Sequence, residues 1–139
     1  MVSPGFFSAD SLAGVHVMLV GREPLARAVL ASALQYGGAL VTPVDTAADA
    51  FALMRHVRAD VLVAVVSGAD DGDLGQIRDV RTRKPEHGGV MPMVLLTPPA
   101  NAPSPDGVRA AGFDACLTLP VSLWRLCRLV ADLVATEGR

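Results

Sequence analysis

The chain has 139 residues, of which 51% are apolar, with 12 basic and 14 acidic side chains and a formal net charge of −2. This composition is typical of one compact globular domain and argues against a disordered or fibrous protein. The weakly negative charge argues against a non-specific nucleic-acid binder, which neutralises phosphates with lysine and arginine. A chain of this length buries about two thirds of its unfolded surface, so its core needs neither disulfides nor metal.

The two cysteines and the N-terminal segment predict a reduced, cytoplasmic protein. Cys116 and Cys127 have a spacing that matches neither a metal-binding knuckle nor a disulfide framework. No apolar run approaches the roughly 20 residues of a membrane span, and the start of the chain lacks the basic head of a secretory signal. Prolines, glycines and polar residues interrupt residues 1–14, so we expect a linker there, a domain that begins near Val15 and extends over 15–136, and a tail over 137–139.

Five short apolar runs recur along the chain and predict β-strands, with helix-patterned segments between them. The first, third and fourth runs are nearly continuous in Val, Leu and Met, as in parallel strands that are covered on both faces. This alternation predicts a doubly wound α/β domain of the flavodoxin-like kind, a (βα)5 unit with a five-stranded parallel sheet in the order 2-1-3-4-5. The predicted strands are 15–20, 40–44, 61–66, 91–96 and 115–118, and the predicted helices are 23–36, 47–58, roughly 74–83, 105–111 and 121–136.

Residues at the helix boundaries agree with this assignment. Thr46 and Ser104 stand where helix N-caps are expected, and Asp49 follows Thr46 by three positions, as in a shortened capping box. A left-handed residue commonly ends a helix, and such positions are occupied by Gly37 and Gly38 after the first predicted helix and by Gly112 after the fourth.

In doubly wound folds, functional groups lie at the carboxyl ends of the strands. The segment LAGVHVMLVGREPLARAVL contains the first strand and its carboxyl end, and RAAGFDACLTLPV contains the fifth strand and the proline that follows it. Together with the alternation of strands and helices, these segments resemble the receiver domain of two-component response regulators and hybrid histidine kinases over nearly the whole of residues 15–136. The resemblance implies a cis peptide bond between Leu119 and Pro120.

The residues that would perform receiver chemistry are mostly replaced. The resemblance implies Mg²⁺ held by two acidic residues after the first strand and by an acceptor aspartate at the end of the third, where this chain has Gly21, Arg22 and Val65. The lysine that steadies the phosphoryl group is replaced by Leu119, and only Thr97 matches the hydroxyl that reports phosphorylation. No carboxylate lies within 61–69, so a one-residue shift does not restore the site. We therefore expect a pseudo-receiver that accepts no phosphate and holds no metal or cofactor.

Arg22 leaves two interpretations open. It either pairs with a nearby carboxylate such as Asp70 or Asp71 and holds one conformation, or binds an anionic ligand through its planar guanidinium. Asp70, Asp71 and Asp73 follow the third strand, where we expect them to cap the next helix rather than line the pocket.

Other catalytic arrangements are missing from the sequence. Gly21 stands alone where a dinucleotide-binding loop needs several glycines, and there is no Walker lysine. Ser67 lacks the G-x-S-x-G surroundings of an exposed nucleophile. His16, His56 and His87 lie at no metal-ligand spacing from one another or from a cysteine, so structural or solvated roles are expected. We therefore expect no enzymatic activity.

The helix predicted over 23–36 carries few polar residues, so its small and apolar residues extend beyond one buried face. In the receiver family this helix commonly docks kinase or phosphotransfer domains, which makes Leu25, Ala28, Val29 and Ser32 candidate contacts. The alternative is that the last helix covers them.

The last helix carries the single tryptophan, Trp124, which either anchors a partner or covers the core. Arg109, Arg125 and Arg128 either form the charged rim of the same surface or are ordinary solvated arginines. The resemblance implies dimerisation or output through the fourth helix, the fifth strand and the last helix. Core spacing on the last helix predicts burial of Leu123, Leu126, Val130, Leu133 and Val134.

A basic set on the second and third predicted helices fits an acidic partner or a cyclic dinucleotide, or is simply a solvated surface. Tyr36 or Trp124 would then stack a base, and an arginine would bind a phosphate or a guanine edge. The set comprises Arg55, Arg58, Arg78, Arg81, Arg83 and Lys84.

The sequence thus favours a cytoplasmic pseudo-receiver module of a two-component phosphorelay, such as part of a hybrid histidine kinase. It would act through contacts with a kinase, a phosphotransfer domain or a neighbouring receiver domain. One alternative is a ligand sensor that binds an anionic nucleotide such as cyclic di-GMP, and another is a structural spacer. Neither nucleic acid nor a membrane is an expected partner.

Overall fold

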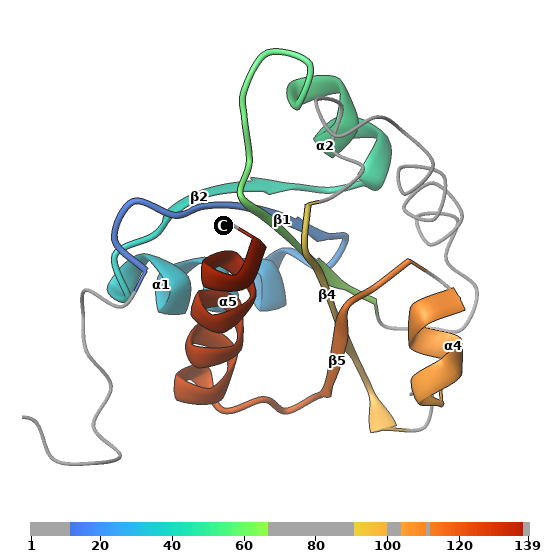
Figure 1. The fold of residues 1–139 in the computed structure, drawn as a ribbon. Helices are drawn as coiled ribbons and strands as arrows, with labels where there is room; N and C mark the ends of the chain where they lie inside the picture. Colours follow the sequence, from blue (N-terminus) through green and yellow to red (C-terminus); the bar gives the residue numbers. More distant parts are fainter. Residues whose placement is uncertain (1–11, 67–90, 100–103, 111, 138–139) are drawn as a thin grey trace, which may run out of the picture.

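The structure is a computed structural model that describes residues 12–66, 91–99, 104–110 and 112–137. Five strands form one all-parallel sheet in the order β2-β1-β3-β4-β5 (Figure 1). The predicted fold class and strand order are confirmed. The strands are β1 (His16–Gly21), β2 (Leu40–Val44), β3 (Val61–Val65), β4 (Met93–Thr97) and β5 (Ala115–Thr118).

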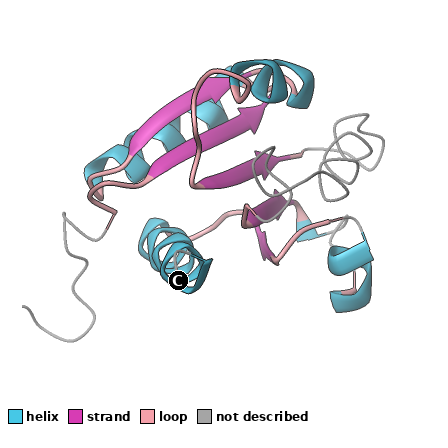
Figure 2. Ribbon diagram, turned by 45° about the horizontal axis from the view of Figure 1, so that its top comes forward, coloured by secondary structure: helices cyan, strands magenta, loops and turns pink. Residues whose placement is uncertain are grey.

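Helices cover both faces of the twisted sheet (Figure 2). Helices α1 (Pro24–Tyr36) and α5 (Leu123–Glu137) pack on one face, and α2 (Ala47–Leu53) and α4 (Pro105–Ala110) pack on the other. The helix predicted over 74–83 lies outside the described residues. The resulting three layers bring the N-terminal ends of the helices to the carboxyl edge of the sheet, because each helix follows a parallel strand.

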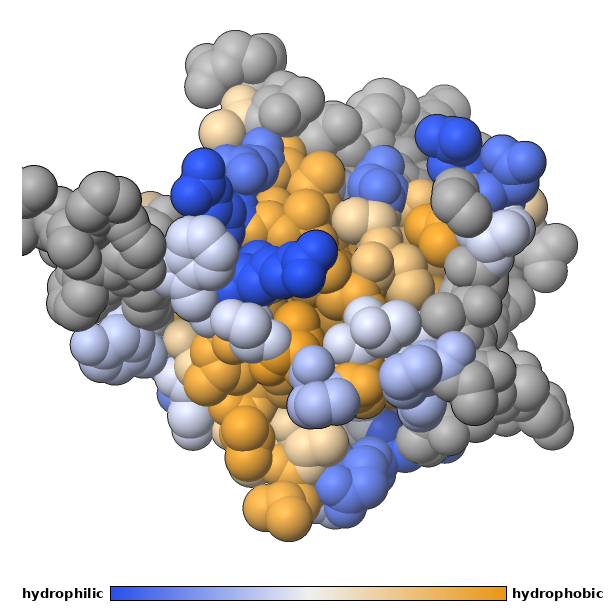
Figure 3. Space-filling view, turned by 90° about the horizontal axis from the view of Figure 1, so that it is seen from below, coloured by the Kyte–Doolittle hydropathy of each residue, from blue (hydrophilic) through white to orange (hydrophobic). Residues whose placement is uncertain are grey.

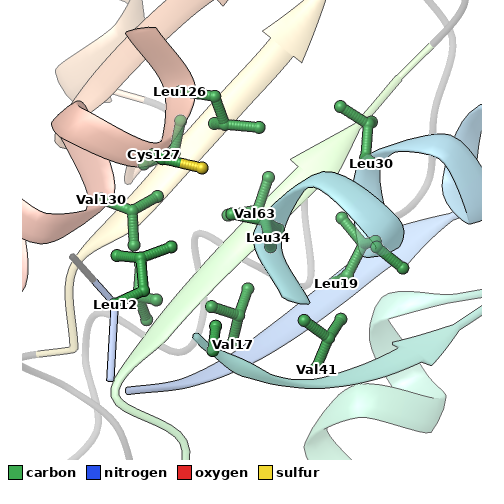
Figure 4. Packing of buried hydrophobic residues seen from close by; sticks show 14 of the residues in the cluster. Leu12, Val17, Leu19, Leu30, Leu34, Val41, Val63, Leu126, Cys127 and Val130 are labelled. Atoms are coloured by element: carbon green, nitrogen blue, oxygen red, sulfur yellow. The ribbon is translucent and has the colours of Figure 1, made fainter. Parts of the chain in front are cut away.

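Alternate side chains of each strand supply two separate cores. Val17 and Leu19 of β1 pack with α1 and α5, whereas Met18 and Val20 pack with α2 and α4. Full burial of one such side chain contributes about 1.5–3 kcal/mol. Figure 4 shows the first core, which includes Leu12, Val17, Leu19, Leu30, Leu34, Val41, Val63, Leu126, Cys127 and Val130.

The predicted helix boundaries are confirmed at several ends. The Thr46 Oγ1 accepts a hydrogen bond from the backbone N–H of Asp49 at 3.1 Å, and the Ser104 Oγ accepts one from Gly107 at 3.1 Å. Gly38 and Gly112 have φ values of +102° and +95°, in the left-handed region that glycine tolerates best.

Helix α2 is shorter than predicted, because it ends at Leu53 instead of near residue 58. The chain after Leu53 turns back toward β3, and the Arg58 carbonyl accepts a hydrogen bond from His16 Nδ1 at 2.6 Å. Asp60 Oδ2 accepts a second one from the His16 backbone N–H at 2.8 Å. These contacts with β1 hold residues 58–60 in the connection to β3, so they are unavailable to the helix.

Two predictions about the ends of the domain are corrected. The packed chain begins before Val15, because Leu12 is completely buried and its N–H donates to the Gly37 carbonyl at 2.7 Å. Leu123 is exposed rather than buried, since it lies in the first turn of α5, whereas Leu126 and Val130 reach the core. The N-terminal linker predicted before Leu12 lies outside the described residues.

Candidate functional site

The residues that were predicted to form the site meet at the carboxyl edge of the sheet. Gly21 and Val65 are paired across β1 and β3, and a Cβ added at Gly21 would lie 3.4 Å from the Val65 Cβ. Thr97 ends β4, and its carbonyl accepts a hydrogen bond from the Leu119 N–H at 2.9 Å. Arg22 follows β1 directly and is exposed. The predicted convergence of these five positions is therefore present.

Two apolar side chains lie at the described part of this edge. Val65 and Leu119 are partly buried and pack against the core between the sheet and α1 and α5. In the ranges that the structure describes, no group of three or more His, Cys, Asp or Glu residues could hold a metal ion. Asp70 and Asp71, which were predicted as partners of Arg22, lie outside the described residues, so that pairing stays a prediction.

Arg27, which the sequence reading did not single out, is the cation that joins the carboxyl ends of β1 and β2. Its Nη1 donates to the Gly21 carbonyl at 2.5 Å and to Asp45 Oδ1 at 2.6 Å. The Arg27 side chain is 19% exposed and that of Asp45 66%. The sequence shows only that Arg27 lies in the first turn of α1 and that Asp45 directly follows β2, and not that the two side chains meet.

The positive N-terminal ends of the described helices are filled by side chains of the chain itself. At α1, Glu23 Oε1 accepts a hydrogen bond from the Ala26 N–H at 2.8 Å. At α5, Ser122 Oγ accepts one from the Arg125 N–H at 3.3 Å. Since Thr46 and Ser104 cap α2 and α4, each described helix already has an oxygen at the end where anions otherwise bind.

The side chain of Thr97, at the end of β4, differs from these hydrogen-bonded cap residues. Its side chain is 1% exposed, and its Oγ1 has no hydrogen-bond partner within the part of the chain that the structure describes. A buried hydroxyl without a partner costs about 1–3 kcal/mol. The Thr97 hydroxyl therefore makes no hydrogen bond with the rest of the described edge, although the Thr97 carbonyl does.

The outer side of α1 is an exposed surface without charge. Leu25 is 71% exposed, Val29 51% and Tyr36 64%, and Ala28 and Ser32 are exposed between them. We call these five residues the α1 surface. The last helix does not cover them, because α5 contacts the opposite side of α1, where Cys127 Sγ lies 3.7 Å from the Ala33 carbonyl. Figure 3 shows apolar side chains gathered in a band on the underside of the molecule.

Trp124 lies in the first turn of α5 and is 37% exposed, with the Arg128 guanidinium carbon 5.5 Å from its ring centroid. Arg109, Arg125 and Arg128 are exposed, as are Arg55 and Arg58 after α2. Arg78, Arg81, Arg83 and Lys84 lie outside the described residues, so the predicted basic set is only partly placed.

Comparison with known proteins gives one sequence relative and many structural ones. No family model matches the chain. A protein of Leptolyngbya boryana, an uncharacterized 14.6 kDa protein in the sodA1 3′ region, is 29% identical over 124 residues, which cover 87% of this chain and 91% of that protein.

The similar solved structures include receiver domains of response regulators and of a histidine kinase. The receiver domain of a histidine kinase from Syntrophus aciditrophicus has a TM-score of 0.75 and 19% identity, and the match covers 91% of this chain and 94% of that one. The chemotaxis protein CheY4 of Vibrio cholerae has a TM-score of 0.73 and 21% identity, with 87% and 99% covered. The chain has the receiver fold. At these identities the likeness shows the fold alone.

Other features agree with the receiver fold or bear on its chemistry. The Leu119–Pro120 bond is cis, as the resemblance implied.

Burial raises the pKa of Cys127 to about 11 and also raises that of Cys116, so both thiols are protonated at neutral pH. None of the helices in the described ranges has the length and apolar character to cross a membrane.

His16 has a structural role at the amino edge of the sheet, opposite the candidate site. Because the Arg58 carbonyl can only accept, Nδ1 of His16 donates to it at 2.6 Å, and Nε2 is hydrogen-bonded to the Thr42 hydroxyl at 2.8 Å. The ring thereby joins β1, β2 and the chain that leads into β3.

Proposed function

We propose that this chain is a pseudo-receiver, a module of two-component signalling that accepts no phosphoryl group and acts through protein contacts on the α1 surface. The observation that carries the proposal is the contrast between two regions. In the described part of the carboxyl edge, Val65 and Leu119 pack against the core and Arg27 donates to the Gly21 carbonyl, whereas the α1 surface is exposed and uncharged.

The chemistry of the carboxyl edge supports the first half of this proposal. An acyl phosphate forms on a carboxylate, and valine at position 65 offers none. Mg²⁺ requires oxygen ligands, which Gly21 and Arg22 do not supply from their side chains. Leu119 leaves no cation to balance a phosphoryl group. The module therefore has no catalytic activity toward a phosphodonor.

The exposure of the α1 surface supports the second half. Without an acyl phosphate, the equilibrium between two packings of the domain can shift only if a partner binds one packing better than the other. Exposed apolar residues that succeed one another on a helix are typical of such a protein contact. A kinase, a phosphotransfer domain or a neighbouring receiver domain is the proposed partner class.

The test is incubation of the purified protein with acetyl phosphate and Mg²⁺, followed by intact mass measurement. We expect no mass increase by a phosphoryl group, whereas a receiver domain with an intact acidic site is modified under the same conditions. A Mg²⁺-dependent, hydroxylamine-sensitive adduct on this protein would overturn the proposal.

A calorimetric titration with cyclic di-GMP separates the protein-contact function from nucleotide sensing. We expect no saturable heat, since the helix N-termini at the carboxyl edge already carry their own oxygens. Saturable binding that Arg22→Ala abolishes would instead assign the module to ligand sensing.

A further inference from the structure

Along the α1 surface, large and small side chains are arranged nearly symmetrically about the middle of the helix. Leu25 and Tyr36 are large and stand at the two ends, and Ala28, Val29 and Ser32 are smaller and stand at the centre. The positions recur every three to four residues, so they lie on one side of the helix. Leu25 and Tyr36 are eleven residues apart, about 16 Å along the axis.

This surface also lacks charge along its whole length. The only charged residue of α1 is Arg27, which points away from the surface to Gly21 and Asp45. Gln35 is the polar residue that stands beside the surface. A strongly acidic or basic partner would therefore leave its charged groups unpaired against α1, whereas an equally uncharged helix would not.

We infer that the occupant of the α1 surface is the α1 surface of a second copy of this chain, with the two helices packed antiparallel. A two-fold axis between Val29 and Ser32 places Leu25 of each copy opposite Tyr36 of the other. It also places Val29 opposite Ser32, so small side chains meet at the centre and the helix axes can approach closely. In the antiparallel arrangement the two helix dipoles point in opposite directions, which is favourable.

The adjacent strand edge gives no competing route for pairing. Strand β2 is at the edge of the sheet and contains Pro43, which has no N–H to donate to an added strand. Association on this side is therefore expected between helices.

This inference rests on the proposed function, because it names the partner of the same surface. The dimer would hold the α1 surface closed to other proteins at high concentration, and dissociation would open it. The contact involves one helix of each copy, so we expect a dissociation constant in the micromolar range, typical of small transient interfaces.

Sedimentation equilibrium over a series from low to several hundred micromolar tests the dimer. We expect the weight-average mass to rise from 14.4 kDa toward about twice that value. Val29→Glu and Ser32→Lys should each weaken association by about tenfold or more, because each places a charge in an apolar contact. The matched control is Leu53→Glu, an exposed apolar residue of α2 on the opposite face, which should leave the mass unchanged.

Mixing the two variants tests the antiparallel pairing itself. In a mixed dimer the carboxylate introduced at position 29 lies opposite the ammonium introduced at position 32, so the mixture should associate more strongly than either variant alone. Thermal unfolding of each variant checks that the fold is intact. A monomeric wild type, or a mixture that stays monomeric, would overturn the inference while leaving the acetyl phosphate test of the proposed function unaffected. Association that Trp124→Glu removes and Val29→Glu does not would place the interface on α5.

Discussion

Thr97 and Thr42 are two threonines of the same sheet whose hydroxyls have opposite surroundings. Thr97 is buried at the carboxyl end of β4 with no partner among the described residues, whereas the Thr42 hydroxyl is bonded to His16 Nε2. Removing a hydroxyl from water costs free energy, and a hydrogen bond inside the protein recovers that cost, whereas an unpaired hydroxyl does not. The two residues therefore form a matched pair for testing whether the hydroxyl at the carboxyl edge still has a function.

We predict that Thr97→Val raises the free energy of unfolding by about 1 kcal/mol, because it replaces an unpaired buried hydroxyl by a methyl group. Thr42→Val should lower it by about 1–3 kcal/mol, because it leaves His16 Nε2 without its partner. Urea unfolding of both variants measures the difference. A loss of stability in Thr97→Val would show that its hydroxyl finds a partner in solution.

Cys127 is the residue for which burial gives a pH dependence. Its folded pKa of about 11 exceeds the ordinary value of 9.0, so the unfolded thiol releases its proton first as the pH rises. The unfolded state then binds fewer protons than the folded state, and the free energy of unfolding falls from about pH 9 toward about pH 11. Cys127→Ala should reduce that fall. An equal fall in the variant and the wild type would refute this assignment.

At the scale of single residues, the sequence predicted positions better than partners. Gly21, Val65 and Leu119 could be placed at one edge because each ends or follows a strand, and strand ends are readable from apolar runs. The contact of Arg27 with Asp45 could not be read in this way. It depends on which turn of α1 faces β2, and on the neighbouring positions of β1 and β2 in the sheet.

Among the elements, α1 is joined at the carboxyl edge to two neighbouring strands. Arg27 joins it to β1 through the Gly21 carbonyl and to the end of β2 through Asp45. The two contacts differ in exposure, because the Asp45 side chain is 66% exposed and the Arg27 side chain 19%. Exposed ion pairs contribute little, so the carbonyl contact is expected to matter more than the carboxylate contact.

We predict that Arg27→Met lowers the free energy of unfolding by about 1–2 kcal/mol, since it removes both contacts and leaves the Gly21 carbonyl unpaired. Asp45→Asn should cost less than about 1 kcal/mol, because Arg27 keeps its contact with Gly21. Denaturant unfolding at low and high salt compares the two variants. Equal losses would mean that the ion pair carries the stabilisation.

The ends of elements were harder to predict than their existence. Helix α2 was predicted to continue to residue 58, because nothing in the local sequence stops it at Leu53. Further along, His16 of β1, more than forty positions away in the sequence, hydrogen-bonds to the Arg58 carbonyl and to Asp60 and so keeps the predicted end of the helix in the connection to β3. Such long-range contacts override local helix propensity.

For the whole molecule, the alternation of apolar runs with helical patterns was sufficient to predict the fold. Parallel strands need crossover helices, and this requirement leaves few possible topologies. Leu12 was missed because it is one apolar residue in a stretch of breakers, and only the packing between α1 and α5 makes it part of the core. The α1 surface was predicted from composition, but its exposure depends on where α5 packs.

The pairing of Gly21 with Val65 bears on what it would take to build an acidic, metal-binding site at this edge of the sheet. A Cβ at position 21 would meet the Val65 Cβ at 3.4 Å, so an aspartate there would bring its carboxylate against an apolar neighbour. An aspartate at position 65 would in turn lie without a magnesium ligand beside it. An acidic, metal-binding site at this pair would therefore require both residues to change together, because neither substitution alone supplies a second carboxylate to share the ion.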